Sequence, residues 1–375
     1  MSSAPTRSLP VSRRALLGGG AAALVAAGGG ALGLQWWRED RRRFAIPAPS
    51  PVPIGTLDTT PLPGLSVGGR SAVGERATRH VLHTALVQRQ TDVIVRLPAS
   101  YASAPARRYP VLYLLHGTGA DCTSWWTDGQ AAQLVGDREV ILVIPDCGGA
   151  GWFTDWPHPS AGRQDWESFH IRQLVPWVDQ TFRTLAEPGG RALAGNSMGG
   201  YGAVVYAARY RQLFDVAAAF SGVGDLGTDY AATEVYDGPA DFGGDRLGAI
   251  YGTDPEAVSR AIAPHDPVLL ADRMRGLRRL ALYCGDGTPD ALGGAAGGEE
   301  AQIRVTNDHL VRALRAQGVA FQWHPQRGVH AWPYWRRHLA AEIGPLTAAL
   351  APARGDPGGH FRVNAQISDA AETAR

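Results

Sequence analysis

The sequence predicts an α/β fold in which helices cover both faces of a mostly parallel sheet. Short, continuous apolar runs alternate along the chain with longer segments whose apolar residues recur at helical spacing. Continuous apolar runs are typical of parallel strands, which are buried on both faces, and their alternation with helices gives crossover units. With 375 residues, 45% hydrophobic and 19% charged, the chain is long enough for one large α/β domain with appendages.

The first 43 residues are typical of an export signal or membrane anchor rather than of a folded domain. Arg13-Arg14 precedes a weakly hydrophobic stretch, residues 15–34, that consists mostly of Ala, Gly and Leu. A twin arginine before such a stretch is typical of a twin-arginine (Tat) export signal. Trp36-Trp37 resembles an interfacial belt, so a retained membrane tether through residues 15–34 is the alternative. We expect an exported protein, either extracellular or held at the cell envelope.

The remaining chain divides into a linker, a folded domain and a tail. Residues 44–78 are rich in Pro, Ser and Gly, and we expect an extended linker there, followed by a domain of residues 79–350 and a disordered tail of residues 351–375. Buried or alternating apolar runs predict strands at 80–87, 91–97, 111–115, 140–144, 216–220, 280–283 and 319–324. Helical spacing predicts helices at 166–182, 201–209, 299–317 and 332–350. Residues 224–263 lack a clear period and predict a small insertion over the functional site.

Composition and motifs exclude several classes of function. A net charge of +1 gives no electrostatic reason to expect nucleic acid as a partner. Neither a P-loop nor a dinucleotide-binding fingerprint is present, and the three cysteines have no metal-site spacing, so we expect no cofactor and no metal. Cys122 and Cys147 each follow a predicted strand, which leaves a disulfide between them as an open alternative in an oxidising compartment.

The strongest functional signal is Gly195-Asn196-Ser197-Met198-Gly199, which matches the pattern G-x-S-x-G. An apolar, strand-like segment (residues 191–194) precedes it, and residues 201–209 with helical spacing follow it. A strand, a tight turn and a helix form a nucleophile elbow, which exposes the serine hydroxyl above a sheet. The alternative is a chance match, because the five-residue pattern alone is common. The flanking strand and helix favour Ser197 as a nucleophile.

A serine hydroxyl is a weak nucleophile at neutral pH and needs a base to take its proton. The best candidate is His330, in the loop between the last predicted strand and the last predicted helix. A carboxylate must hold the imidazole in one tautomer. Asp286, Asp290, Glu299 and Glu300 all lie in or just beyond the loop after the strand at 280–283. Their spacing does not choose among them.

The oxyanion of such a reaction needs two backbone N–H donors. We expect one from Met198, directly after the nucleophile, and the other from Thr118, in the loop after the strand at 111–115. His116 in the same loop either shapes the loop or contacts the substrate. Trp156 and Trp332 belong to a set of aromatic residues that either line an acceptor site or pack in the interior.

Six motifs together resemble a known family. They are Tyr113-Leu114-Leu115-His116-Gly117, Phe153-Thr154-Asp155-Trp156, Trp166-Glu167-Ser168-Phe169, the elbow, Tyr283-Cys284-Gly285-Asp286-Gly287-Thr288-Pro289 and His330-Ala331-Trp332-Pro333-Tyr334-Trp335. Through them, residues 110–350 resemble the esterase D-like branch of the α/β-hydrolases and, within it, the antigen 85 mycolyltransferases. The resemblance implies an α/β-hydrolase fold.

The resemblance also implies roles for individual residues. It places the nucleophile on Ser197, the base on His330 and the oxyanion donors on Thr118 and Met198. Mycolyltransferases use a glutamate followed by an arginine and an asparagine, and matching these to Arg304 and Asn307 places the acid on Glu300. Other esterase D relatives use an aspartate nearer Asp286 or Asp290.

One departure bears on the substrate. His116 and Gly119 stand where mycolyltransferases carry an aspartate and an arginine that face trehalose, which argues against trehalose recognition and leaves ester chemistry unaffected. The sequence therefore predicts an exported serine esterase that acts on a small ester or an acyl-glycolipid. One alternative is an acyltransferase that moves the acyl group to a sugar or alcohol hydroxyl. Another is a catalytically silent surface binding protein.

Overall fold

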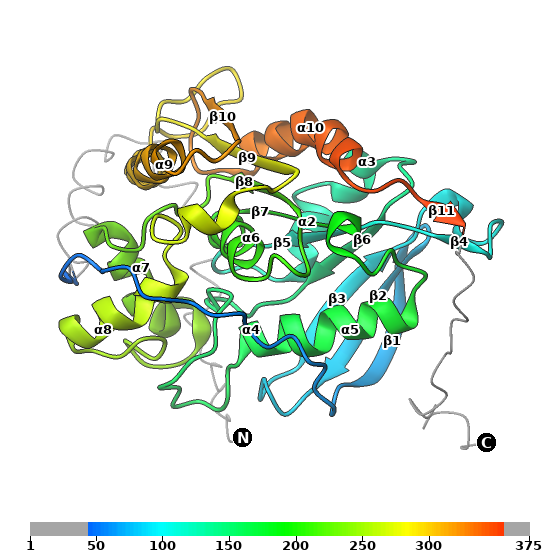
Figure 1. The fold of residues 1–375 in the computed structure, drawn as a ribbon, viewed down its shortest axis with the longest axis horizontal. Helices are drawn as coiled ribbons and strands as arrows, with labels where there is room; N and C mark the ends of the chain where they lie inside the picture. The colour runs from blue at the N-terminus through cyan, green and yellow to red at the C-terminus, as the bar shows by residue number, and fades with distance from the viewer. Residues whose placement is uncertain (1–43, 356–375) are drawn as a thin grey trace, which may run out of the picture. The chain divides into compact units, whose positions relative to one another are not determined.

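The computed structural model describes residues 44–355 (Figure 1). The expected export signal and residues 356–375 of the expected tail lie outside the described residues. Within residues 44–355, no helix combines the length and the apolar character that crossing a bilayer requires.

The centre of the fold is a nine-stranded sheet with the order β1-β2-β3-β6-β5-β7-β8-β9-β10. Its strands are β1 (Ser66–Gly74), β2 (Ala77–His83), β3 (Thr91–Arg96), β5 (Val111–Leu115), β6 (Ile141–Pro145), β7 (Arg191–Asn196), β8 (Val216–Phe220), β9 (Arg279–Cys284) and β10 (Gln322–Pro325). In this order, β1 pairs with β2, β2 with β3 and β3 with β6 in antiparallel fashion. All the remaining neighbours, from β6 across to β10, pair in parallel. A separate two-stranded sheet joins β4 (Arg107–Arg108) to β11 (Arg354–Gly355). The predicted, mostly parallel sheet is confirmed.

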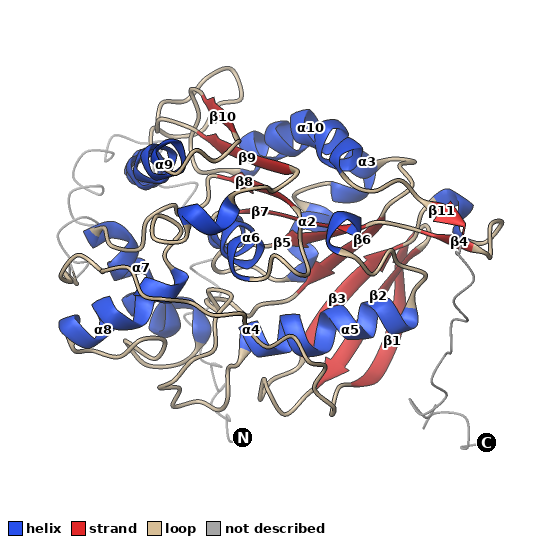
Figure 2. Cartoon of the chain, in the orientation of Figure 1, coloured by secondary structure: helices blue, strands red, loops and turns tan. Residues whose placement is uncertain are grey.

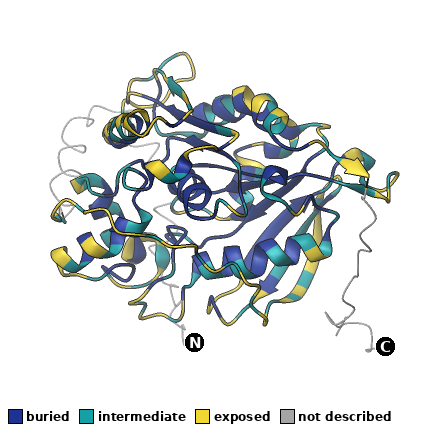
Figure 3. Ribbon diagram, in the orientation of Figure 1, coloured by how far each residue is buried: buried dark blue, intermediate teal, exposed yellow. Residues whose placement is uncertain are grey.

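Helices cover both faces of this sheet (Figure 2). One face carries α4 (Trp166–Phe169), α5 (Val175–Thr181), α6 (Met198–Arg209) and α9 (Gly298–Ala316), and the other carries α2 (Cys122–Thr127), α3 (Ala131–Val135) and α10 (Trp332–Ala349). Alternate residues of β5 point to opposite faces, so Tyr113 joins one apolar core whereas Leu112 and Leu114 join the other. The central strands are consequently buried on both sides (Figure 3).

The predicted helix at 166–182 is interrupted by one π-helical turn, His170–Leu174, between α4 and α5. Pro176 lies in the first turn of α5 and has no N–H, so the carbonyl of Arg172 lacks its usual helical donor. The N–H of Leu62 takes that place with a hydrogen bond of 2.8 Å. The Pro-rich segment is therefore joined to the domain at this point. Short 3₁₀ turns complete the helical elements at Ala99–Tyr101, Pro188–Gly190, Ala263–His265 and Ala271–Met274.

The predicted linker of residues 44–78 is corrected by two observations. First, β1 lies inside it, so the sheet begins at Ser66 rather than near Arg79. Second, the carbonyls of Ile54 and Leu57 accept hydrogen bonds from side chains of the domain, which attach this segment to it. Apolar side chains also hold the segment, since Ile54, Leu57 and Leu62 are partly buried against the core.

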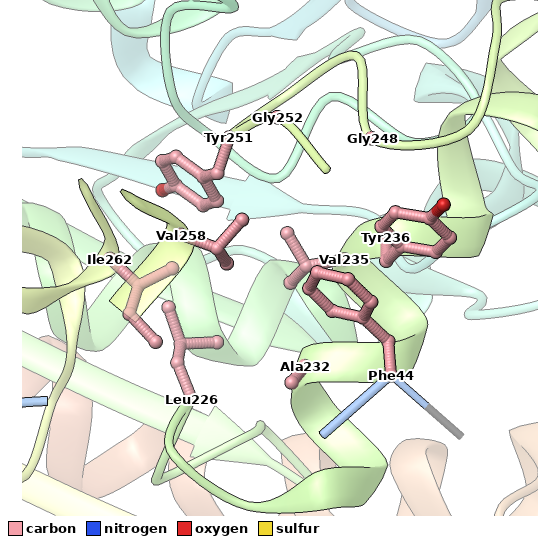
Figure 4. Close-up of a pocket in the computed structure, with 10 residues that line it drawn as sticks. All are labelled: Phe44, Leu226, Ala232, Val235, Tyr236, Gly248, Tyr251, Gly252, Val258 and Ile262. Atoms are coloured by element: carbon pink, nitrogen blue, oxygen red, sulfur yellow. The ribbon is translucent and has the colours of Figure 1, made fainter. Parts of the chain in front are cut away.

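The predicted insertion forms between β8 and β9. It contains α7 (Asp229–Gly238), a π-helical turn (Pro239–Gly243) and α8 (Pro255–Ile262). An apolar cavity of about 10 Å³ lies inside it, and the ring of Phe44 stacks on Tyr236 at 4.1 Å beside that cavity (Figure 4). Residues before the sheet therefore complete the packing of the insertion.

All three cysteines lie in the described part of the chain and are buried free thiols. The disulfide between Cys122 and Cys147 that the sequence left open does not form in this structure.

Candidate active site

Ser197 occupies a strained turn between β7 and α6. Its φ is 52° and its ψ is −125°, a conformation that residues with a side chain rarely adopt. A Cβ atom on Gly195 would lie 2.5 Å from the backbone of Gly199, and one on Gly199 would overlap the carbonyl oxygen of Leu115. Glycine is therefore required at both positions for strand and helix to approach this closely. The local geometry is that of a nucleophile elbow.

Three residues from distant parts of the chain form a continuous line of hydrogen bonds. The Oγ atom of Ser197 lies 2.9 Å from Nε2 of His330, and Nδ1 of His330 lies 2.7 Å from Oε2 of Glu300. His330 comes from the loop between β10 and α10, and Glu300 lies in the first turn of α9. The structure thus brings together the serine, the histidine and one of the four candidate carboxylates.

Glu300 is almost fully buried, with 1% of its surface exposed, and both of its oxygens have partners. Oε1 accepts hydrogen bonds from Oγ of Ser221 (2.7 Å) and from the N–H of Gly285 (2.6 Å), while Oε2 faces His330. Burial raises the pKa of this carboxyl, but the hydrogen bonds from His330, Ser221 and Gly285 outweigh burial and lower the pKa below its usual value. Glu300 is therefore ionised at neutral pH and accepts a hydrogen bond from Nδ1–H of His330.

His330 carries the opposite shift. Burial lowers the pKa of its imidazole, but the negative charges of Glu299, Glu300 and Glu234 outweigh burial and raise the pKa to about 9. Oε1 of Glu299 lies 3.7 Å from Nε2, on the side that faces the serine. The ring also packs edge-on against Trp335, with ring centres 4.8 Å apart. The imidazole is thus held in place from several sides.

The other two candidate carboxylates are engaged elsewhere. Asp286 is exposed and accepts a hydrogen bond from the N–H of Thr288. Asp290 pairs with Arg337 at 2.5 Å. Of the four carboxylates, only Glu300 contacts Nδ1 of His330.

Ser221 is part of this site and was not predicted from the sequence. It follows β8 directly, is fully buried and has a φ of 52°. Its hydroxyl donates to Glu300 and accepts a hydrogen bond of 3.2 Å from the indole N–H of Trp335. The available signal is a Ser-Gly pair at the carboxyl end of a predicted strand, next to the strand that leads into the elbow.

Met198 directly follows the serine and Thr118 lies in the loop after β5, and their roles as oxyanion donors stay predictions. Gly117, which precedes Thr118, packs so closely against the elbow that a Cβ atom on it would lie 3.1 Å from Cβ of Ser197. Met198 is the first residue of α6, and an N–H in that position has no acceptor within its own helix. The N–H of Met198 therefore has no helical partner next to Ser197.

Of the alternatives that the sequence left open for His116 and Trp156, the structure favours interior packing over contact with substrate. His116 is fully buried, and its ring nitrogens contact the carbonyl of Gly117 and the N–H of Cys147. Trp156 is also buried, and its indole donates to the carbonyl of Gly151. Both side chains shape loops from the interior.

Trp332 is half-buried and lies two residues from His330. Its contact with substrate stays a prediction.

Phe242, an aromatic residue that the sequence analysis did not select, lies on the surface. Phe242 is 46% exposed, and its ring lies 3.2 Å from where a Cβ atom on Gly119 would be. It therefore borders the loop that carries Thr118. Phe242 could not be selected from the sequence, because the insertion has no hydrophobic period that separates exposed from buried positions.

The family model described as "Putative esterase" matches residues 84–346, which is more than half of the chain. The chain belongs to this esterase family. The resemblance seen in the motifs is thereby confirmed, and the protein is a member of a family of carboxylic ester hydrolases.

Two relatives of this chain are an esterase and an acyltransferase. The chain is 33% identical to Esterase Rv1288 of Mycobacterium tuberculosis over 303 residues, a match that covers 78% of this chain and 65% of that protein. It is 30% identical to the diacylglycerol acyltransferase/mycolyltransferase Ag85C of Mycobacterium avium over 246 residues, covering 61% and 68%. The chain thus spans less than two thirds of the length of Esterase Rv1288.

A solved structure supports the fold. An S-formylglutathione hydrolase from Agrobacterium tumefaciens superposes with a TM-score of 0.60 over 76% of this chain and 100% of that chain, at 16% sequence identity. The predicted α/β-hydrolase fold is confirmed.

Proposed function

We propose that this esterase-family protein hydrolyses carboxylic esters through an acyl-enzyme formed on Ser197. The observation that carries the proposal is the unbroken line of hydrogen bonds from Ser197 through His330 to Glu300, built on a strained elbow. A strained turn costs free energy, on the order of 1–3 kcal/mol, and it is retained where it positions a reacting group. Membership of the esterase family supports the same reaction class.

In the first half-reaction, His330 in its neutral form accepts the proton of Ser197 while Oγ bonds to the ester carbonyl carbon. The N–H groups of Thr118 and Met198 donate to the oxyanion that forms. Glu300 remains ionised and stabilises the imidazolium. His330 then gives its proton to the departing alcohol oxygen as the C–O bond breaks. In the second half-reaction, water attacks the acyl-enzyme by the same route.

The direct test uses p-nitrophenyl esters of varied chain length. We expect wild-type protein to release p-nitrophenol and Ser197→Ala to lose that activity. Labelling by a fluorophosphonate should likewise require Ser197. Folded wild-type protein that hydrolyses no ester and takes no label would instead support a silent binding protein.

A second candidate is acyl transfer to a sugar or alcohol hydroxyl, and the similarity to the Ag85C acyltransferase favours considering it. The acyl-enzyme is the same, so only the acceptor differs. Supplying glycerol or trehalose together with an ester, and identifying the products by mass spectrometry, separates the two. We expect the free acid to predominate, and a predominant acylglycerol or acyltrehalose would show a transferase.

We further propose that Arg13-Arg14 directs export of the protein to the cell envelope or the medium. The supporting feature is the twin arginine before a weakly hydrophobic stretch. Replacing both arginines by lysine in the native host and fractionating the cells tests this. The variant should accumulate in the cytoplasm, and unchanged export would contradict the proposal.

A further inference from the structure

Two successive glutamates contact opposite sides of one imidazole. Glu300 holds Nδ1 of His330, whereas Oε1 of its neighbour Glu299 lies 3.7 Å from Nε2, the nitrogen that faces Ser197. The side chain of Glu299 is 41% exposed, in contrast to the buried Glu300. Glu299 therefore presents a carboxylate oxygen at the solvent side of the reacting nitrogen.

The distance of 3.7 Å between Oε1 of Glu299 and Nε2 of His330 allows one oxygen atom to contact both. Two atoms 3.7 Å apart can both contact a single oxygen that lies at hydrogen-bond distance, about 2.8 Å, from each. In deacylation the attacking oxygen must sit beside Nε2, because His330 takes its proton. An oxygen in that place is also within reach of Glu299.

The nature of the nucleophile then matters. A water molecule carries two hydrogens, so it can give one to Nε2 and donate the other to a carboxylate, which only accepts hydrogen bonds. A hydroxyl of a simple alcohol carries one hydrogen on the attacking oxygen, and Nε2 takes it. A carboxylate at this point consequently favours water over such an alcohol.

We propose that Glu299 accepts the second hydrogen of the attacking water and so selects hydrolysis over acyl transfer. The inference rests on the function proposed above. The water oxygen bonds to the acyl carbon, and one of its hydrogens passes as a proton to Nε2 of His330. That proton moves to Oγ of Ser197 as the bond between Oγ and the acyl carbon breaks. The second hydrogen stays on the released acid, which then loses it to solvent.

A purely electrostatic role for Glu299 has different consequences. The charges that face His330 come from Glu299 and Glu300 of α9 and from Glu234 of α7, and all three raise the pKa of its imidazole. A change in this pKa alters the basicity of His330 toward water and toward an alcohol alike. Loss of a hydrogen-bond acceptor for the second hydrogen affects water alone. The ratio of the two products therefore separates the two roles.

The experiment measures how the acyl-enzyme divides between water and methanol. Wild-type protein, Glu299→Gln and Glu299→Ala are supplied with p-nitrophenyl butyrate in buffered methanol, and methyl butyrate and butyrate are quantified. This ratio depends only on steps after acylation. The matched control is Asp308→Asn, which removes one negative charge from the same helix, where Asp308 pairs with Arg304 at 3.1 Å.

We expect Glu299→Ala to raise the ratio of methyl ester to acid about tenfold, because one hydrogen bond to a charged group is lost. Glu299→Gln should raise the ratio less, since its amide oxygen still accepts, and Asp308→Asn should leave the ratio unchanged. An unchanged ratio in a folded, fluorophosphonate-labelled Glu299→Ala would overturn the inference. Wild-type protein that forms no acyl-enzyme would instead overturn the proposed function, and the two failures are distinguishable.

Discussion

The hydroxyl of Ser221 donates a 2.7 Å hydrogen bond to Oε1 of Glu300, the carboxylate whose other oxygen contacts His330. A residue directly after β8 thus fixes a carboxylate on α9, and both lie beside the elbow between β7 and α6. A buried carboxylate that lacked this donor would have a higher pKa and a less defined orientation. Ser221 is in this sense a positioning residue for the site.

Removing the hydroxyl of Ser221 should slow ester hydrolysis. Ser221→Ala deletes one of the hydrogen bonds to ionised Glu300, and a hydrogen bond to a charged group contributes about 1.5–3 kcal/mol. We expect kcat to fall by roughly tenfold or more, with KM nearly unchanged. Steady-state kinetics on p-nitrophenyl butyrate measures this. Ser221→Gly is the matched control for backbone strain at a φ of 52°, because it lacks the hydroxyl but relieves the strain. Equal activity of both variants and wild-type protein would contradict the assigned role.

Glu300 should be far more important than the carboxylates that the sequence offered in its place. Glu300→Gln keeps the size of the side chain but loses the charge that holds the imidazole tautomer, so we expect kcat/KM to fall by about 10³- to 10⁴-fold. Asp286→Asn should retain nearly full activity, because its carboxylate is exposed and accepts a hydrogen bond from the N–H of Thr288. A strong loss in Asp286→Asn with little loss in Glu300→Gln would reassign the acid.

The activity should rise with pH. The pKa of His330 is raised from 6.5 to about 9 in the folded protein, and only the neutral imidazole can accept the proton of Ser197. We therefore expect kcat/KM to increase through pH 8 toward a midpoint near 9, within about one pH unit. Glu299→Gln should move this midpoint downward, since it removes one of the charges that raise the pKa. A profile already flat above pH 7 would contradict the predicted ionisation.

The contribution of His330 to folding stability should fall as the pH rises, whereas the activity should increase. Because the folded pKa lies above the unfolded value of 6.5, the charged form of His330 stabilises the fold below that pH, and the contribution disappears as the pH rises through about 9. Urea unfolding of wild-type protein and His330→Ala at pH 6.5 and at pH 9.5 measures the difference. The stability advantage of the wild type over the variant should shrink at the higher pH.

Phe242 should influence which acyl or alcohol groups are accepted. Its exposed ring borders the loop of Gly119, so an apolar part of a substrate bound near Ser197 can pack against it. Each buried methylene contributes about 0.8 kcal/mol. We expect Phe242→Ala to lower kcat/KM for p-nitrophenyl octanoate several-fold and for the acetate very little. Leu292→Ala, at another exposed apolar residue, serves as the comparison.

Much of the fold could be predicted because strong local patterns specify it. Apolar runs such as Val111–Leu115 and Val216–Phe220 are long enough to indicate strands buried on both faces, and the structure places both in the central sheet. β1 was missed because its sequence has no such run and its order comes from backbone pairing with β2. Its start at Ser66 could not be read from side-chain pattern.

The candidate site could be predicted only in part, for a physical reason. Ser197 and His330 lie in recognisable local settings, a tight turn and a loop before a helix. The choice of Glu300 among four carboxylates depends on where α9 begins, and spacing alone did not give it. Ser221 was missed because its role requires a left-handed backbone conformation and a contact with α9. The burial of His116 likewise follows from tertiary packing and not from its neighbours in sequence.

The central claim is that the hydroxyl of Ser197 forms the covalent intermediate with help from His330. The most direct measurement treats the protein with a fluorophosphonate and locates the adduct by peptide mass spectrometry. Wild-type protein should carry one adduct, on the peptide that contains Ser197, and His330→Ala should react at least a hundredfold more slowly. An adduct on another residue, or equal labelling of folded Ser197→Ala, would contradict the claim.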